Sequence, residues 1–313
     1  MGIRERISGT SLGFVALVGV NAIWGSTDTV AKIAVEELGA HGLTWLRFTV
    51  AFIAFVPVLI IRRDELPKKA VEYLPFVALG LCGFAANFFI FYHGLQLSHA
   101  SHATALRVSE ALAILVLSRI FLGERIGGKA FLGLILGIAG MAFVLDINFG
   151  GLSLFGEGYR LGDVLIILGI VVEGLYTVVG KGVLKKTRPL TATALACVCG
   201  WLILTAASTG EIIRIASDPP SITAIFACLY LGLVATVFCY WVWYVVLSGH
   251  ESHRVGVTVM VQPLVGLPMA ALVIGEREVF DPGFMAGAAL IAAGVYLASR
   301  PPSPGSAVKE ADG

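Results

Sequence analysis

The chain has 313 residues and a formal net charge of +1 at pH 7, and 57% of its residues are hydrophobic while 14% are charged. Its mean hydropathy of +0.88 exceeds what a soluble core of this size needs to bury, which excludes an ordinary soluble domain and indicates a protein of the lipid bilayer. The near-neutral charge also excludes nucleic-acid binding through bulk electrostatics.

Apolar stretches of roughly 20 residues, the length that spans a bilayer, follow one another along the chain. They cover residues 11–31, 41–61, 72–92, 103–122, 129–147, 161–181, 190–209, 222–247, 254–274 and 283–299. The sequence therefore predicts an all-α membrane protein with ten transmembrane helices. Arg4 and Arg6 precede the first stretch as in a signal peptide, but that stretch continues through Trp24 to Ala31, which favours an uncleaved helix.

The basic residues predict the orientation. Of 22 Lys and Arg residues, Arg47 and Arg107 lie within helices. With a cytoplasmic N-terminus, the outer side receives Lys32, Arg160, Arg214 and Arg277, and the other sixteen fall on the inner side. By the positive-inside rule both termini lie in the cytoplasm, and we expect a multi-pass protein of the cell (inner) membrane.

An internal repeat is visible in two short motifs. Leu122-Gly123-Glu124-Arg125 and Ile274-Gly275-Glu276-Arg277 each end one apolar stretch and precede another. Lys32 pairs with Lys181 in the first helices of the two halves, and Gly133 and Gly140 pair with Gly287 and Gly294 in the last. Residues 1–147 and 161–299 therefore form two five-helix repeats, and the odd helix number inverts the second repeat. Residues 300–313 are expected to be a disordered tail.

These marks resemble the drug/metabolite transporter superfamily, EamA type, over residues 11 to 299. The resemblance rests on Trp24-Gly25-Ser26 followed by Lys32, on Arg47-Phe48, and on the Gly-Glu-Arg that closes helices four and nine. It implies a secondary carrier, usually an exporter of amino acids, related metabolites or drugs, with a central cavity between the halves. One departure is that helix nine has Gln262-Pro263, whereas the matching stretch of helix four reads Glu110-Ala111 without the proline.

Charged groups that remain at helix centres usually face a cavity or a partner, because burying them in a bilayer costs a few kcal/mol each. They are Asp28, Arg47, Arg107, Glu110 and Glu173. Arg107 and Glu110 are three residues apart and either pair with each other or contact substrate or a proton. Asp28 either pairs with Lys32 or lines the path. Arg47, which matches the family's second-helix arginine, either binds substrate or ties backbone carbonyls.

Glu173 has no cation near it in sequence and lies on a stripe of small and polar residues with Tyr176, which makes it the leading candidate for a functional carboxylate. Gln262 aligns with Glu110, and Trp24 is expected to line the path. Substrate-binding or coupling roles are thus predicted for Glu173, Glu110, Arg107, Tyr176, Gln262, Trp24, Asp28 and Arg47. Tyr240, Trp243 and Tyr244 are interpreted first as an interfacial aromatic belt, with a cavity wall as the alternative.

His93, His99 and His102 match no zinc spacing, so no metal is expected, and a pH-sensitive outer gate is the other possibility for them. The five cysteines lie in apolar stretches, where inert fillers are favoured over disulfides or ligands. No cofactor is expected, and the oligomeric state is left open.

Three carboxylates against two arginines within the helices favour a substrate that bears an amine. The sequence predicts a secondary exporter of small amine-bearing metabolites that works by alternating access, with protons as a coupling partner. A multidrug or cationic-compound exporter and a channel-like uniporter are the alternatives. A nucleotide-driven pump is disfavoured because no GxxxxGK[ST] motif occurs, and an intramembrane enzyme because no GxSxG or HExxH motif occurs.

Overall fold

The structure is a computed structural model of the chain, and it describes residues 11–124, 127–144, 160–275 and 282–299. Within these ranges the chain is helical and contains no strand. By length and composition, six described stretches are able to cross a membrane: Leu12–Ile61, Ala70–Gln96, Leu161–Val183, Pro189–Ala207, Ile222–Leu247 and Ser252–Val273. The predicted all-α membrane protein is confirmed.

The first half contains α2 (Ser11–Ile61), α3 (Leu74–Gly80), α4 (Ala86–Gln96), α5 (Ala100–Leu106), α6 (Val108–Leu122) and α7 (Gly128–Val144). The 51 residues of α2 include a kink at Gly39, whose φ of 69° is non-helical, so α2 holds two of the predicted spans. Only glycine adopts such a φ without strain, and the chain therefore reverses here without a long loop.

The second half contains α8 (Arg160–Val183), α9 (Pro189–Ala207), α10 (Thr209–Ser217), α11 (Ile222–Leu229), α12 (Cys239–Leu247), α13 (Ser252–Gly256), α14 (Gln262–Val273) and α15 (Pro282–Ser299). All ten predicted stretches coincide with described helical segments, except for a few residues at their ends that lie outside the described ranges. Apart from Thr209, its first residue, the short α10 lies outside the predicted spans.

Several helices are irregular near their middles. A π-helical turn, η3 (Leu81–Ala85), joins α3 to α4, and a longer one, η4 (Tyr230–Phe238), joins α11 to α12. A 3-10 segment, η5 (Val257–Val261), joins α13 to α14, where Pro263 lacks the N–H that a regular helix would use. Arg107 separates α5 from α6. Such irregular turns are frequent at functional sites because they free backbone groups and re-aim side chains.

Two lysines make equivalent contacts in the two halves. Lys32 Nζ donates to the carbonyls of Leu95 (3.0 Å) and Ser98 (2.9 Å) at the end of α4. Lys181 Nζ donates to the carbonyls of Leu247 (2.7 Å) and His250 at the end of α12. A lysine at a helix C-terminus satisfies carbonyls that have no intrahelical partner. The pairing of Lys32 with Lys181 in sequence thus corresponds to a shared structural role.

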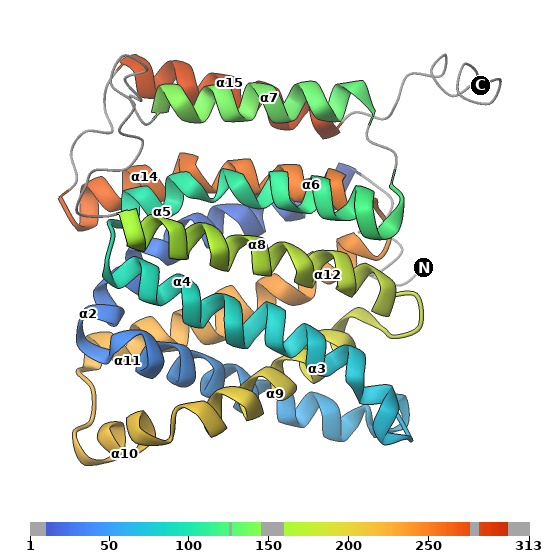
Figure 1. Cartoon of the computed structure of the whole chain (residues 1–313), viewed down its shortest axis with the longest axis vertical. Helices are drawn as coiled ribbons and strands as arrows, with labels where there is room; N and C mark the ends of the chain where they lie inside the picture. The colour runs from blue at the N-terminus through green and yellow to red at the C-terminus, as the bar shows by residue number, and fades with distance from the viewer. Residues whose placement is uncertain (1–10, 125–126, 145–159, 276–281, 300–313) are drawn as a thin grey trace.

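The last helices of the two halves, α7 and α15, lie side by side at one end of the molecule (Figure 1). A Cβ placed on Gly140 would lie 2.6 Å from the carbonyl oxygen of Gly287, and one on Gly294 would lie 2.6 Å from that of Gly133. Exchanging the paired glycines of the two repeats converts one contact into the other. This reciprocity supports the repeat hypothesis, and the boundaries at residues 147 and 161 remain predictions. Residue 147 and the predicted tail at 300–313 fall outside the described residues.

The glycines of the two Gly-Glu-Arg motifs end helices. Gly123 follows α6 with φ 65°, and Gly275 follows α14 with φ 90°. Glycine at this position ends a helix readily because the left-handed conformation costs it little. The Arg125, Glu276 and Arg277 positions of the motifs lie outside the described residues.

Candidate functional site

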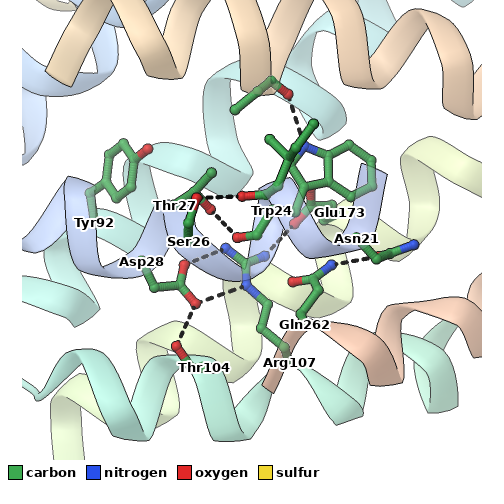
Figure 2. A network of polar contacts seen from close by, with 12 residues as sticks. Asn21, Trp24, Ser26, Thr27, Asp28, Tyr92, Thr104, Arg107, Glu173 and Gln262 are labelled. Atoms are coloured by element: carbon green, nitrogen blue, oxygen red, sulfur yellow. Dashed lines mark hydrogen bonds and ion pairs between the residues drawn. The ribbon is translucent and has the colours of Figure 1, made fainter. Parts of the chain in front are cut away.

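Arg107 lies at the centre of a buried group of charges that joins three helices. Its Nη2 donates to Asp28 Oδ1 of α2 at 3.0 Å, and its Nη1 donates to Glu173 Oε2 of α8 at 2.9 Å. Figure 2 shows the guanidinium between the two carboxylates. The side chains of Arg107 and Asp28 are only 7% and 2% exposed. One cation thus pairs with two carboxylates away from solvent, and this group of three keeps one net negative charge.

This arrangement differs from the pairing that sequence spacing allowed within helix four. Arg107 sits at the break between α5 and α6, so its side chain reaches α2 and α8 rather than Glu110 on the next turn. The face of the Phe91 ring lies 4.2 Å from the guanidinium carbon, which adds a cation–π contact. Asp28 also accepts from Thr104 Oγ1 at 3.2 Å. The predicted pair of Asp28 with Lys32 is replaced, because Lys32 caps α4.

Glu173 is held at both carboxylate oxygens. Oε2 accepts from Arg107, and Oε1 accepts from the hydroxyl of Tyr240 at 2.7 Å. Its side chain is 12% exposed. Sequence reasoning found no cation for Glu173 because Arg107 is 66 positions away along the chain. Glu173 is therefore a carboxylate fixed within a network.

Glu110 differs from the other two carboxylates. It is 4% exposed, and among the described residues no hydrogen bond or ion pair to its carboxylate is found. A buried carboxylate without a counter-ion is costly as an anion, so such a group either holds a proton or awaits a cation.

Arg47 is the second buried cation, and it contacts hydroxyls and rings in place of a carboxylate. Nη1 donates to the Tyr92 hydroxyl at 2.5 Å and Nε to Thr236 Oγ1 at 2.9 Å. The guanidinium carbon lies 4.2 Å from the centre of the Phe88 ring. Arg47 is 2% exposed, and within the described ranges no acidic side chain pairs with it. Its positive charge is therefore uncompensated by a direct ion pair.

A small cavity lies between these groups. It is lined by Trp24, Thr27, Arg47, Phe88, Arg107, Glu110, Glu173, Tyr240 and Gln262. The lining comes from both halves of the chain and includes two arginines and two carboxylates, with Asp28 directly behind Arg107. Such a concave, charged site within an apolar helical protein suits a small polar ligand.

Gln262, which aligns with Glu110 between the repeats, is held by a hydrogen bond from its side-chain amide. Its Nε2 donates to Asn21 Oδ1 at 2.9 Å, and Asn21 Nδ2 donates to Thr258 Oγ1 at 2.9 Å. Figure 2 shows the Gln262–Asn21 contact beside the arginine network. The two aligned positions therefore differ. Gln262 carries an amide that a neighbouring side chain holds in place, whereas Glu110 carries a carboxylate that no neighbouring side chain of the described residues pairs with.

Six of the eight predicted site residues line the cavity: Trp24, Arg47, Arg107, Glu110, Glu173 and Gln262. Asp28 lies behind them. Tyr176 is buried near the cavity and stacks on Tyr244 with ring centroids 4.7 Å apart, but it does not line it. Whether these residues bind substrate stays a prediction.

The aromatic cluster of helix eight is buried inside the protein, so it does not form the interfacial belt that its sequence first suggests. Tyr240, Trp243 and Tyr244 are each at most 2% exposed. Tyr240 lines the cavity, and Trp24 packs against both Tyr240 and Trp243. The alternative of a cavity wall holds for Tyr240. Thr27 and Phe88 also line the cavity and carried no sequence signal beyond lying on apolar helices.

Two groups of hydrogen bonds join the two halves away from the cavity. Glu124, after α6, accepts from the backbone N–H groups of Ser252 (2.8 Å) and His253 (3.2 Å) at the start of α13, and lies 3.1 Å from His253 Nδ1. Burial alone would raise the pKa of Glu124, but these hydrogen bonds outweigh burial and lower this pKa to about 2. At the start of α8, Asp163 accepts from Ser98 Oγ at 2.6 Å and lies 3.3 Å from His102 Nδ1. In each group, a carboxylate of one half accepts hydrogen bonds from the other half.

The histidines and cysteines show no arrangement for a metal. Among the described residues, no three His, Cys, Asp or Glu side chains lie close enough to hold one. His102 faces Asp163, whereas His93 packs against His41 with ring centroids 5.1 Å apart. The five cysteines are free thiols.

An all-helical, apolar protein with a charged cavity between two similar halves has the architecture of a membrane transporter. The comparison with protein families agrees, since the model of the EamA-like transporter family matches residues 11–146 and 160–300. The chain belongs to this family.

Curated relatives match over nearly the whole chain. An uncharacterized transporter of Archaeoglobus fulgidus is 26% identical over 92% of this chain and 98% of that protein. A probable amino-acid metabolite efflux pump of Escherichia coli is 26% identical over 91% and 93%. A probable terminal-alkyne amino-acid exporter of Streptantibioticus cattleyicolor is 27% identical over 91% and 92%. A solved crystal structure covers 92% of this chain and 96% of its own with a TM-score of 0.66 at 20% identity, which shows the fold alone.

Proposed function

We propose that this transporter exports small amine-bearing metabolites, amino acids or related compounds, from the cytoplasm by alternating access. The observation that carries the proposal is the charge balance of the cavity together with Asp28, which pairs with Arg107 from behind: Asp28, Glu110 and Glu173 supply three carboxylates, and Arg47 and Arg107 supply two guanidiniums. One negative charge is left over, which favours a ligand with an ammonium group. Two of the relatives are named as probable exporters of amino acids or their metabolites.

Protons are the proposed coupling ion, and Glu110 is their proposed site. Glu110 forms no ion pair among the described residues, whereas Asp28 and Glu173 share Arg107. A proton neutralises Glu110 when the cavity is empty, and the ammonium of the substrate replaces that proton when it binds. One site that holds either a proton or an ammonium exchanges the two across the membrane.

The same surplus of negative charge also favours a second candidate, an exporter of cationic drugs. A channel-like uniporter is separated from both by counterflow, because only a carrier shows saturable exchange. The protein is proposed to lie in the inner membrane with both termini in the cytoplasm.

The purified protein is reconstituted into liposomes, and counterflow of a labelled panel of amino acids and cationic compounds is measured with and without a pH gradient. We expect saturable exchange of amino acids that a pH gradient accelerates. Glu110→Gln should abolish the response to the gradient and reduce exchange about 10- to 100-fold, the range expected for losing one charge-assisted hydrogen bond. Glu173→Gln should abolish exchange, because it removes one of the two carboxylates that hold Arg107.

Glu36→Gln is the matched control, since the side chain of Glu36 is 69% exposed and lies away from the cavity. It should exchange at the wild-type rate. Wild-type rates in both Glu110→Gln and Glu173→Gln would refute the carboxylate assignment. Exchange of cationic drugs without any amino acid would establish the second candidate.

A further inference from the structure

The cavity contains one buried cation and one buried anion that lack ion-pair partners. Arg107 forms ion pairs with Asp28 and Glu173 through contacts of 3.0 and 2.9 Å, and these three groups together keep one net negative charge. Arg47 and Glu110 do not take part in these ion pairs, and both line the cavity. The two residual charges have opposite sign and come from different elements, α2 and α6.

Arg47 is held so that part of its guanidinium remains available. Nε and Nη1 donate to Thr236 and Tyr92, while no acceptor for Nη2 is found in the described part of the chain. The Phe88 ring covers the guanidinium from one side, which fixes its plane. A guanidinium held in this way offers N–H donors to a carboxylate, the group that its fork geometry fits best.

Hydroxyl partners alone leave the charge of a buried arginine uncompensated. The Tyr92 and Thr236 hydroxyls satisfy two donors, but a neutral hydroxyl does not cancel a positive charge. The same reasoning applies with opposite sign to Glu110. A ligand with a carboxylate at one end and an ammonium at the other supplies both missing charges at once.

We infer that Arg47 and Glu110 form a zwitterion template in which Arg47 binds the carboxylate and Glu110 the ammonium of a free amino acid. The inference rests on the proposed function and narrows it from amine-bearing compounds to zwitterions. Arg107 is assigned a different role: it holds Asp28 and Glu173 in place. The template explains why a cavity with a carboxylate surplus also keeps a second arginine.

Binding to the purified full-length protein tests the template by removing one charged end of the ligand at a time. The probes are the twenty L-amino acids, each compared with its α-amide, which loses the carboxylate, and with its deaminated acid, which loses the ammonium. We expect the wild-type protein to bind an amino acid at least about tenfold more tightly than either derivative, because each derivative loses one charge-assisted hydrogen bond.

The variants assign the two ends. Arg47→Gln should bind the amino acid and its amide equally, while Glu110→Gln should bind the amino acid and the deaminated acid equally. Arg188→Gln, at a side chain that is 66% exposed, is the charge-matched control and should keep the wild-type ratios. Arg47→Lys keeps the charge without the fork and should retain a smaller preference for the amino acid.

Two results overturn the inference while the proposed function survives. The first is a wild-type protein that binds amino acids and their amides equally tightly. The second is an Arg47→Gln variant that weakens amino acid and amide by the same factor, which would make Arg47 a purely structural residue. If Arg47→Gln does not fold, the affinities of the wild-type protein for the amino acid, its amide and its deaminated acid still test the template. A folded wild-type protein that binds no amino acid and no amide refutes the proposed function itself.

Discussion

Arg107 and Glu110 lie three residues apart, yet their buried charges have opposite energetic consequences. Arg107 pairs with two carboxylates, so its removal leaves both Asp28 and Glu173 without a cation. Breaking a buried ion pair by removing one partner is strongly destabilising. Glu110 has no such partner among the described residues, so its neutralisation removes a cost.

Arg107→Gln should therefore lower the free energy of unfolding by about 3–5 kcal/mol. The measurement is unfolding of the purified protein in detergent, followed by tryptophan fluorescence. Glu110→Gln is the companion variant and should be as stable as the wild-type protein or more so. Combining Arg107→Gln with Glu173→Gln and Asp28→Asn should restore much of the lost free energy of unfolding. Equal destabilisation by Arg107→Gln and Glu110→Gln would contradict the pairing of Arg107 with Asp28 and Glu173.

The charge pairing could not be predicted from the sequence, for a physical reason. Spacing within one helix shows which residues share a face of that helix, but not which face meets which neighbour. The break at Arg107 turns its side chain toward α2 and α8, and Glu173 receives its cation from 66 positions away. What the sequence did indicate is that charges within apolar helices converge on a polar site.

At the scale of the elements, close helix packing depends on glycines at the contact points. In bilayers small residues let helix backbones approach, because lipid supplies little hydrophobic drive for association between helices. Gly140 of α7 meets the backbone of α15 at Gly287, as described above. An added methyl group there pushes the two helices apart.

Gly140→Ala is expected to destabilise the protein by about 1–3 kcal/mol, the usual cost of overpacking. Gly182→Ala in α8 is the matched control, because nothing lies within 4 Å of a Cβ there. That control should gain up to about 1 kcal/mol from helix propensity. The free energies of unfolding of the two variants are compared in detergent. A Gly140→Ala variant as stable as Gly182→Ala would show that α7 and α15 move apart at little cost.

The elements themselves were readily predicted from the sequence. A membrane helix must be long and continuously apolar, so the ten stretches stand out between charged or glycine-rich turns. The irregular turns η3 and η4 were not predicted, because no proline marks them. The inward position of Tyr240 was also missed, since helix eight is apolar on every side and its sequence does not show which face is buried.

At the scale of the whole molecule, the two halves share contacts that a tandem duplication explains. Lys32 and Lys181 cap equivalent helix ends, and the glycines of α7 and α15 exchange roles. If the halves are inverted, loops at matching positions in the two repeats face opposite sides of the membrane. The distribution of Lys and Arg predicts which side each loop faces.

This orientation is open to a direct test with two introduced cysteines. Lys185, in the turn between α8 and α9, and Asp218, after α10, are both exposed and lie on opposite predicted sides. A membrane-impermeant maleimide added to intact cells should label Asp218→Cys and should label Lys185→Cys only after the membrane is opened. The wild-type chain gives the background, because its five cysteines are buried or partly buried. The reverse pattern would place both termini outside and would turn the proposed export into uptake by the same cavity.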